Sequence, residues 1–311
     1  MKLPEHVVIR ELGLREGFQM HPTVVSTDQK FRLLQALVAT GVSEIEVTSF
    51  VRPDRVPQLA DAEALVQLLP ADSETIFTAL YLNERGFERA VRFPQLTTRG
   101  WIATAVSDTF LEKNAGTSRA KVLASVSRWC ELFAAHGRSF HGILVSTAFG
   151  CAYEGTVNPH EVVDGVGAIL AAASAPHRAR EVCLADTVGL GAPDTIHETV
   201  SLLRAAFPEL ELALHVHDTR GTGMANAYAG LLEGVAIFEC SVGGMGGCPF
   251  PPGAAGNLAT EDFAYLCHRL GVSTGIDLAQ YQRVALLAEE MLGRQLPGKF
   301  MRSSVEPPRT R

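Results

Sequence analysis

The sequence predicts a (β/α)8 TIM barrel with a short helical extension at the C-terminus, and three observations point to this fold class. Short runs of β-branched residues alternate eight times with amphipathic stretches along the chain. Repeats of this kind join parallel strands through right-handed crossovers, and a barrel of eight holds roughly 250 residues in one domain. No strand candidate is followed by the Gly-x-Gly-x-x-Gly fingerprint of an open dinucleotide-binding sheet.

The elements are expected in strict alternation. The eight strands are predicted at residues 7–12, 44–50, 76–82, 101–107, 141–147, 181–187, 213–218 and 236–242. The helices are predicted at residues 27–40, 58–69, 84–93, 118–136, 159–173, 193–207, 223–234 and 260–270, with an extra helix at 277–292. Helix-start residues support three of them: Ser26, Asn158 before Pro159, and Pro193.

The domain organisation follows from the same pattern. Residues 1–295 are expected to form one catalytic domain, because no Ser/Gly-rich linker interrupts the chain. Residues 296–311 are expected to be a loose tail.

Composition excludes several classes of protein. The net charge of −7, from 27 Lys and Arg against 34 Asp and Glu, argues against a nucleic-acid binder. No apolar run approaches the roughly 18 residues of a membrane span, and the N-terminus lacks the apolar core of a signal peptide. The six cysteines include no CxxC pair, which favours a reduced compartment over disulfides or structural zinc. We therefore expect a cytoplasmic protein without membrane or nucleic-acid partners.

Polar residues that stand out from this apolar background fall where predicted strands end. In a TIM barrel the active site forms at that rim. The residues concerned are Arg15 and Glu16 after the first strand, Glu46 in the second, Asp186 in the sixth, His215 and His217 in the seventh, and Cys248 and Asn257 after the eighth.

A metal site is one interpretation of four of these residues. Residues i and i+2 of a strand share a face, so His215 and His217 can reach one point; a pair of hydrogen-bonded barrel histidines is the alternative. Adding the carboxylate of Glu16 and the amide oxygen of Asn257 gives two nitrogen and two oxygen ligands. That set suits Mg²⁺ or Mn²⁺, although Zn²⁺ also accepts histidine and carboxylate.

The other rim residues have chemical and structural interpretations side by side. Arg15 can stabilise an enolate oxygen or form a structural ion pair. Glu46 and Asp186 can be reacting groups or buried hydrogen-bond partners. Cys248 lies in a glycine- and proline-rich loop, where a thiol can transfer a proton. Four other cysteines, at positions 130, 183, 240 and 267, are expected in the core, and Cys151 can line the pocket.

The sequence resembles the 3-hydroxy-3-methylglutaryl-CoA (HMG-CoA) lyase family of TIM-barrel metallolyases. The resemblance extends over residues 7–290 and is carried by REGFQ (15–19), EVTSFV (46–51), GCAYEG (150–155), DTVG (186–189), HVHDT (215–219), SVGGMGGCPF (241–250) and GNLATED (256–262). The glycine-rich loop with GNLATED is specific to the lyase branch, whereas HVH marks only the wider group.

The resemblance implies a metal-dependent retro-Claisen cleavage of an acyl-CoA substrate. HMG-CoA would split into acetyl-CoA and acetoacetate, in a protein expected to be a homodimer. Glu16, His215, His217 and Asn257 would bind the metal. The catalytic set would be Arg15, Glu16, Glu46, His215 and Cys248: Arg15 would stabilise the enolate, Glu46 would position the reactants, and Cys248 would supply a proton.

One departure from the family bears on the substrate. The family has aspartate where this chain has Glu16, a side chain longer by one C–C bond, about 1.5 Å. A different 3-hydroxyacyl-CoA, such as citramalyl-CoA, is therefore an alternative substrate. A Claisen-type synthase and a non-catalytic acyl-CoA-binding barrel are further alternatives. For contacts with CoA, Arg52, Lys113 and Asn114 are candidates, with solvated surface charge as the other interpretation.

Overall fold

The computed structural model describes residues 3–19, 21–173, 177–246 and 256–303. The chain divides into two compact units. Among the described residues, unit 1 comprises Leu3 and 98–237, and unit 2 comprises 4–97 and those from Phe238 onward. The expectation of a single domain over residues 1–295 stays a prediction.

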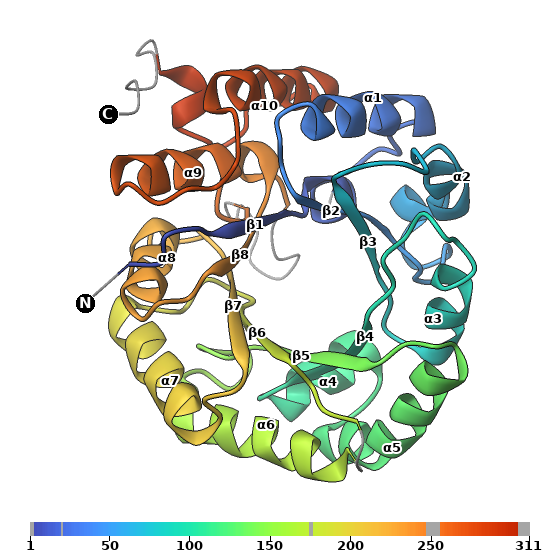
Figure 1. Ribbon diagram of the computed structural model, residues 1–311, viewed down its shortest axis with the longest axis vertical. Coiled ribbons are helices and arrows are strands. Elements are labelled where there is room, and N and C mark those ends of the chain that lie inside the picture. The colour runs from blue at the N-terminus through green and yellow to red at the C-terminus, as the bar shows by residue number, and fades with distance from the viewer. Residues whose placement is uncertain (1–2, 20, 174–176, 247–255, 304–311) are drawn as a thin grey trace. The chain divides into compact units, whose positions relative to one another are not determined.

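Unit 1 is built on four parallel strands. In chain order they are β4 (Gly100–Ala105), β5 (Phe140–Ser146), β6 (Glu181–Asp186) and β7 (Glu211–Val216), each paired with the next. Every residue of β6 is buried, as expected for a parallel strand that is covered on both faces. Figure 1 draws these strands in green to yellow.

Helices separate the strands of unit 1 along the chain. They are α4 (Asp108–Ala115), α5 (Arg119–Ala135), α6 (Pro159–Ala172), α7 (Pro193–Ala206) and α8 (Gly223–Leu232). From α5 to α8 each helix packs against the next, and α5, α6 and α7 line one side of the unit's strands (Figure 1). The side chain of Asn158 caps α6 by accepting from the backbone N–H of His160 at 3.0 Å.

Unit 2 contains the first three strands and nearly all of the eighth. They are β1 (Val8–Glu11), β2 (Glu44–Ser49), β3 (Ile76–Leu80) and β8 (Ile237–Cys240). Strands β1, β2 and β3 pair in parallel. The backbone N–H of Leu12 donates to the carbonyl oxygen of Cys240 at 2.8 Å, which joins the end of β1 to the end of β8.

Five α-helices complete unit 2. They are α1 (Thr27–Val38), α2 (Ala62–Gln67), α3 (Glu84–Ala90), α9 (Thr260–Arg269) and α10 (Leu278–Leu292). Helix α10 packs against α1 and α9. Ser26 begins α1 as predicted, with its hydroxyl accepting from the N–H of Gln29 at 3.3 Å.

The predicted strands and helices are confirmed, and the main differences are short elements at strand ends. Residues Gly13–Gly17 form a single π-helical turn, residues 108–115 form the additional helix α4, and Val242–Gly244 form a 3-10 turn where the eighth strand was expected to continue. Each is too short to show a hydrophobic period in the sequence.

Part of the segment expected to be loose is packed within unit 2. Leu296 and Met301 are buried, and the N–H of Gly298 donates to the carbonyl oxygen of Gly243 at 3.0 Å. The carboxylate of Asp262 accepts from the backbone N–H of Phe300 at 2.6 Å. Residues 304–311 lie outside the described residues.

None of the helices in the described part of the chain has both the length and the apolarity needed to cross a bilayer.

The carboxyl group of Glu261 is buried next to Gly298 of the packed C-terminal segment. Glu261 is fully buried and accepts from the N–H of Gly243 at 3.0 Å. Its other oxygen, Oε1, has no hydrogen-bond partner among the described residues. Burial, with a smaller contribution from the charge of Asp262, raises the pKa of Glu261 to about 8.

This raised pKa predicts a pH-dependent stability. Between the ordinary value of 4.5 and about 8, the folded protein holds a proton that the unfolded chain releases. The contribution of Glu261 to stability is therefore lost as pH rises through this window. Because Glu261→Gln is neutral at every pH, its Tm should rise relative to the unmodified protein between pH 5 and pH 8, measured by calorimetry.

The control is Glu198→Gln, at an exposed position of α7, whose Tm difference should stay flat over the same range. A flat difference for Glu261→Gln as well would show that Glu261 ionises normally in the folded state.

Candidate functional site

The first group of site residues lies on the π-helical turn Gly13–Gly17 that follows β1. Such turns are frequent at functional sites. A Cβ atom at Gly13 would lie 2.6 Å from Glu11 Oε1 and 2.7 Å from Val242 Cγ1, and one at Gly17 would lie 2.8 Å from Met245 Cβ. Only glycine therefore lets this turn pack against the segment that follows β8.

Arg15 forms ion pairs with two carboxylates. Its Nε donates to Glu46 Oε1 at 2.5 Å, and its Nη1 donates to Glu16 Oε1. Only 12–16% of each of these three side chains is exposed. Burial alone would lower the pKa of Arg15, but the carboxylates of Glu16 and Glu46 outweigh it and raise that pKa. Arg15 is therefore a fixed positive charge.

Asn257 joins this group from the start of the GNLATED segment. Its Nδ2 donates to Glu16 Oε2 at 2.6 Å and to the carbonyl oxygen of Met245 at 3.1 Å. The residue is 2% exposed, and its Oδ1 has no hydrogen-bond partner among the described residues. A buried amide oxygen without a donor is unusual and is available to a cation.

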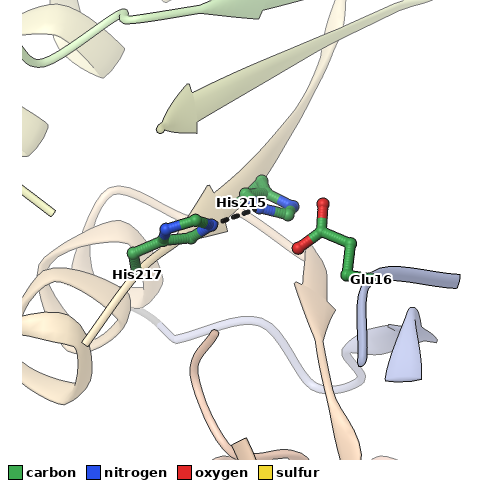
Figure 2. Close-up of side chains that lie close together, drawn as sticks. All are labelled: Glu16, His215 and His217. Carbon is green, nitrogen blue, oxygen red and sulfur yellow. Dashed lines mark hydrogen bonds between the residues drawn. The ribbon is translucent and has the colours of Figure 1, made fainter. Parts of the chain in front are cut away.

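Two histidines form a second group, at the end of β7 in unit 1. Both are buried, and their Nε2 atoms are 3.0 Å apart in a hydrogen bond (Figure 2). One imidazole must supply the proton of this bond and the other the lone pair. The two side chains meet at one point, as their spacing predicts, and whether they bind a metal stays a prediction.

Asp186, at the end of β6, acts as a hydrogen-bond acceptor for the following turn. Its Oδ1 accepts from the N–H groups of Leu190 and Gly191 at 2.9 and 3.1 Å. Burial raises its pKa, against the opposing effect of these two bonds. This geometry supports the structural interpretation of Asp186.

The cysteines of the described residues lie in the protein interior. Five cysteines are buried and form no disulfide within the described residues: Cys130, Cys151, Cys183, Cys240 and Cys267. This confirms the core positions predicted for four of them. Cys248 lies outside the described residues.

Two of the candidates for contacts with CoA make interactions of their own. Arg52 pairs with Asp54 on the surface, with 66% of its side chain exposed, and the ammonium of Lys113 lies 4.1 Å from the ring centroid of Tyr153.

Two features at strand ends were missed by sequence reasoning. Thr147, directly after β5, has a φ of +53°, which is rare for a β-branched residue. Its N–H donates to Thr187 Oγ1 at 2.8 Å, and its Oγ1 accepts from the N–H of Ser107 at 3.2 Å. Glu11, the last residue of β1, is fully buried. A glutamate or threonine at the end of a strand carries no local signal for either arrangement.

Comparison with known proteins matches these residues to one family. The family model described as HMGL-like matches residues 6–287. The hydroxymethylglutaryl-CoA lyase YngG of Bacillus subtilis is 33% identical, covering 96% of this chain and 97% of that protein. An (R)-citramalyl-CoA lyase of Chloroflexus aurantiacus is 34% identical, covering 94% and 93%.

A solved structure agrees over the whole chain. The HMG-CoA lyase of Acenitobacter baumannii, in complex with coenzyme A and 3-methylmalate, matches with a TM-score of 0.86 and 31% identity and covers 99% of both chains. The TIM-barrel fold class is confirmed.

The glycine that packs against this group provides a test of its geometry. A Cβ atom at Gly246 would lie 2.8 Å from Asn257 Nδ2 and 3.1 Å from Glu16 Cβ. Gly246→Ala should therefore move Asn257 away from Glu16, at a cost of about 1–3 kcal/mol for overpacking beyond the strain of a positive φ. Thermal unfolding measures this cost.

The matched control is Gly271→Ala, because Gly271 has a φ of +75° and nothing within 4 Å of the added Cβ. It should lose about 1–2 kcal/mol from backbone strain alone. Equal losses in the two variants would mean that the contact of Gly246 with Asn257 is not tight.

Proposed function

Because this chain belongs to the HMGL-like family and is an acyl-CoA lyase, we propose that it cleaves HMG-CoA into acetyl-CoA and acetoacetate by a metal-dependent retro-Claisen reaction. One observation carries the proposal. The buried amide oxygen of Asn257 has no hydrogen-bond partner among the described residues. The same residue binds Glu16, whose carboxylate also pairs with Arg15. A potential metal ligand and a fixed cation are thus held together in unit 2.

The proposed metal ligands are Glu16, His215, His217 and Asn257. The three drawn in Figure 2 offer one carboxylate and two imidazoles, and Asn257 adds an amide oxygen. These groups fit a divalent cation. The Oδ1 of Asn257 has lone pairs that accept no hydrogen bond from any described residue, and a cation would use them. The paired imidazoles would add nitrogen ligands. The oxygen ligands suit Mg²⁺ or Mn²⁺, and Zn²⁺ also accepts a set of histidine and carboxylate ligands.

When bound, the metal would polarise the substrate hydroxyl and lower its pKa, as it does for water. Residues of the protein would carry out the remaining steps. Loss of the hydroxyl proton to a base, which we assign to Glu16 or His215, lets the hydroxyl carbon become a carbonyl as the C2–C3 bond breaks. The electron pair of that bond passes to the acetyl-CoA fragment as an enolate.

Arg15 and Cys248 would complete the reaction on the enolate. The charge of Arg15 is fixed by Glu16 and Glu46, so it would stabilise the enolate oxygen without titrating. Cys248 would then protonate the enolate carbon to give acetyl-CoA. Glu46 acts through Arg15 and positions it.

Citramalyl-CoA is a second candidate substrate, and two observations favour it. An (R)-citramalyl-CoA lyase is as similar to this chain as the HMG-CoA lyases are, and Glu16 stands where the resemblance leads us to expect aspartate. Both thioesters would lose acetyl-CoA by breaking the same type of bond. Acetyl-CoA release from each substrate, with and without Mn²⁺, separates the two.

A homodimer and a cytoplasmic location remain predictions from the family and the composition.

Replacing Cys248 tests the proton-transfer role. Cys248→Ala should lower kcat about 10²–10⁴-fold, the usual range for losing a general acid. The metal content, measured by atomic emission, should stay unchanged. Cys130→Ala, at a buried cysteine of α5, is the control and should keep kcat. A loss of metal from the Cys248 variant would contradict the assigned role.

Shortening Glu16 tests the substrate assignment. Glu16→Asp should keep or raise acetyl-CoA release from HMG-CoA, because it restores the carboxylate length expected from the family. Glu46→Asp is the matched change on the other side of Arg15, and it should lower kcat about a hundredfold, the cost of a misplacement of about 1 Å. If Glu16→Asp abolishes cleavage of HMG-CoA, Glu16 is adapted to another thioester.

A further inference from the structure

Glu11 accepts hydrogen bonds from four segments of unit 2, and two of these segments lead to residues of the candidate site. Its side chain is fully buried. Oε1 accepts from the backbone N–H of Gly13 at 2.7 Å and of Val242 at 2.9 Å. Oε2 accepts from Thr260 Oγ1 at 2.6 Å and from the Tyr281 hydroxyl. One carboxylate therefore receives four donors from separate parts of the unit.

The positions of these donors along the chain relate Glu11 to the site. Gly13 begins the π-helical turn that carries Arg15 and Glu16. Val242 begins the 3-10 turn that leads to Met245, whose carbonyl oxygen accepts from Asn257. The two backbone bonds to Oε1 thus hold the start of the turn that carries Glu16 and the start of the segment whose Met245 carbonyl oxygen binds Asn257.

The other two donors lie on the scaffold. Thr260 is the first residue of α9, and Tyr281 lies within α10. These helices pack against each other, so the bonds to Oε2 tie the carboxylate to a rigid support. The two oxygens have separate tasks: Oε2 is held by the helices, and Oε1 holds the two turns.

We infer that Glu11 is a positioning residue, which fixes Arg15, Glu16 and Asn257 through the backbone N–H groups of Gly13 and Val242. The inference rests on the proposed lyase function. Glu11 is fully buried and accepts from four protein donors, so it would act through these groups and not by touching the substrate or the metal. Its acceptor oxygen Oε1 sets the geometry of the residues that would do so, as outer-shell groups do around metal sites.

The test compares variants that keep or remove this acceptor. Glu11→Met fills a similar volume without an acceptor, and it should lower kcat and the affinity for Mn²⁺ at least about tenfold each. Glu11→Gln should restore both to within about threefold, because its amide oxygen can accept from Gly13 and Val242 while its NH₂ faces the two hydroxyls. Mn²⁺ affinity is measured by calorimetry without substrate.

Two controls separate positioning from stability. Tyr281→Phe removes one of the two donors to Oε2 and leaves Thr260 and both backbone donors in place, so it should lower the Tm and lower kcat less than Glu11→Met does. Glu44→Met removes a buried carboxylate that pairs with Arg10 on the neighbouring strand, and it should also lower the Tm without changing kcat. If Glu11→Met does not fold, Glu11→Asp, which withdraws the carboxylate by about 1.5 Å, must show the same loss of kcat and Mn²⁺ affinity.

The outcomes distinguish this inference from the proposed function. An unmodified protein that releases no acetyl-CoA and binds no Mn²⁺ contradicts the proposed function. If the unmodified protein is active and the folded Glu11→Met or Glu11→Asp variant keeps kcat and Mn²⁺ affinity, the positioning role is wrong. A Glu11→Gln variant as impaired as Glu11→Met also overturns it.

Discussion

The candidate site of unit 2 depends on one largely buried guanidinium held between two carboxylates. Arg15 pairs with Glu46 on β2 and with Glu16 on its own turn. A buried ion pair compensates for its desolvation only if its geometry is nearly fixed and its remaining polar atoms are satisfied. The surrounding residues meet this condition. Asn257 binds the second oxygen of Glu16, and glycines at positions 13, 17 and 246 let the backbone approach closely enough.

The fold could be predicted because its signal is periodic and repeated. Short strands and amphipathic helices alternate along the chain, and the parallel strand β6 is buried along its whole length. The π-helical turn at Gly13–Gly17 and the packing of residues 296–303 could not be predicted. Both depend on contacts with residues far away in the chain, such as Met245 and Asp262.

The sequence predicts which residue types form the site, but it predicts only some of the hydrogen bonds and ion pairs between their side chains. The spacing of His215 and His217 predicts that their side chains share a face, and their Nε2 atoms do meet. Arg15 was assigned either to chemistry or to an ion pair, and the structure shows the ion pair that also keeps it charged. Glu11 was missed because its four donors lie up to 270 residues away, and no local pattern reports such contacts.

We propose that Glu16, Asn257, His215 and His217 bind one divalent cation. Anomalous diffraction from crystals grown with Mn²⁺ tests this claim most directly. We expect a single strong peak, bonded to the carboxylate of Glu16, the amide oxygen of Asn257 and both imidazoles. A peak that lacks the two histidines, or no peak at these four side chains, would contradict it.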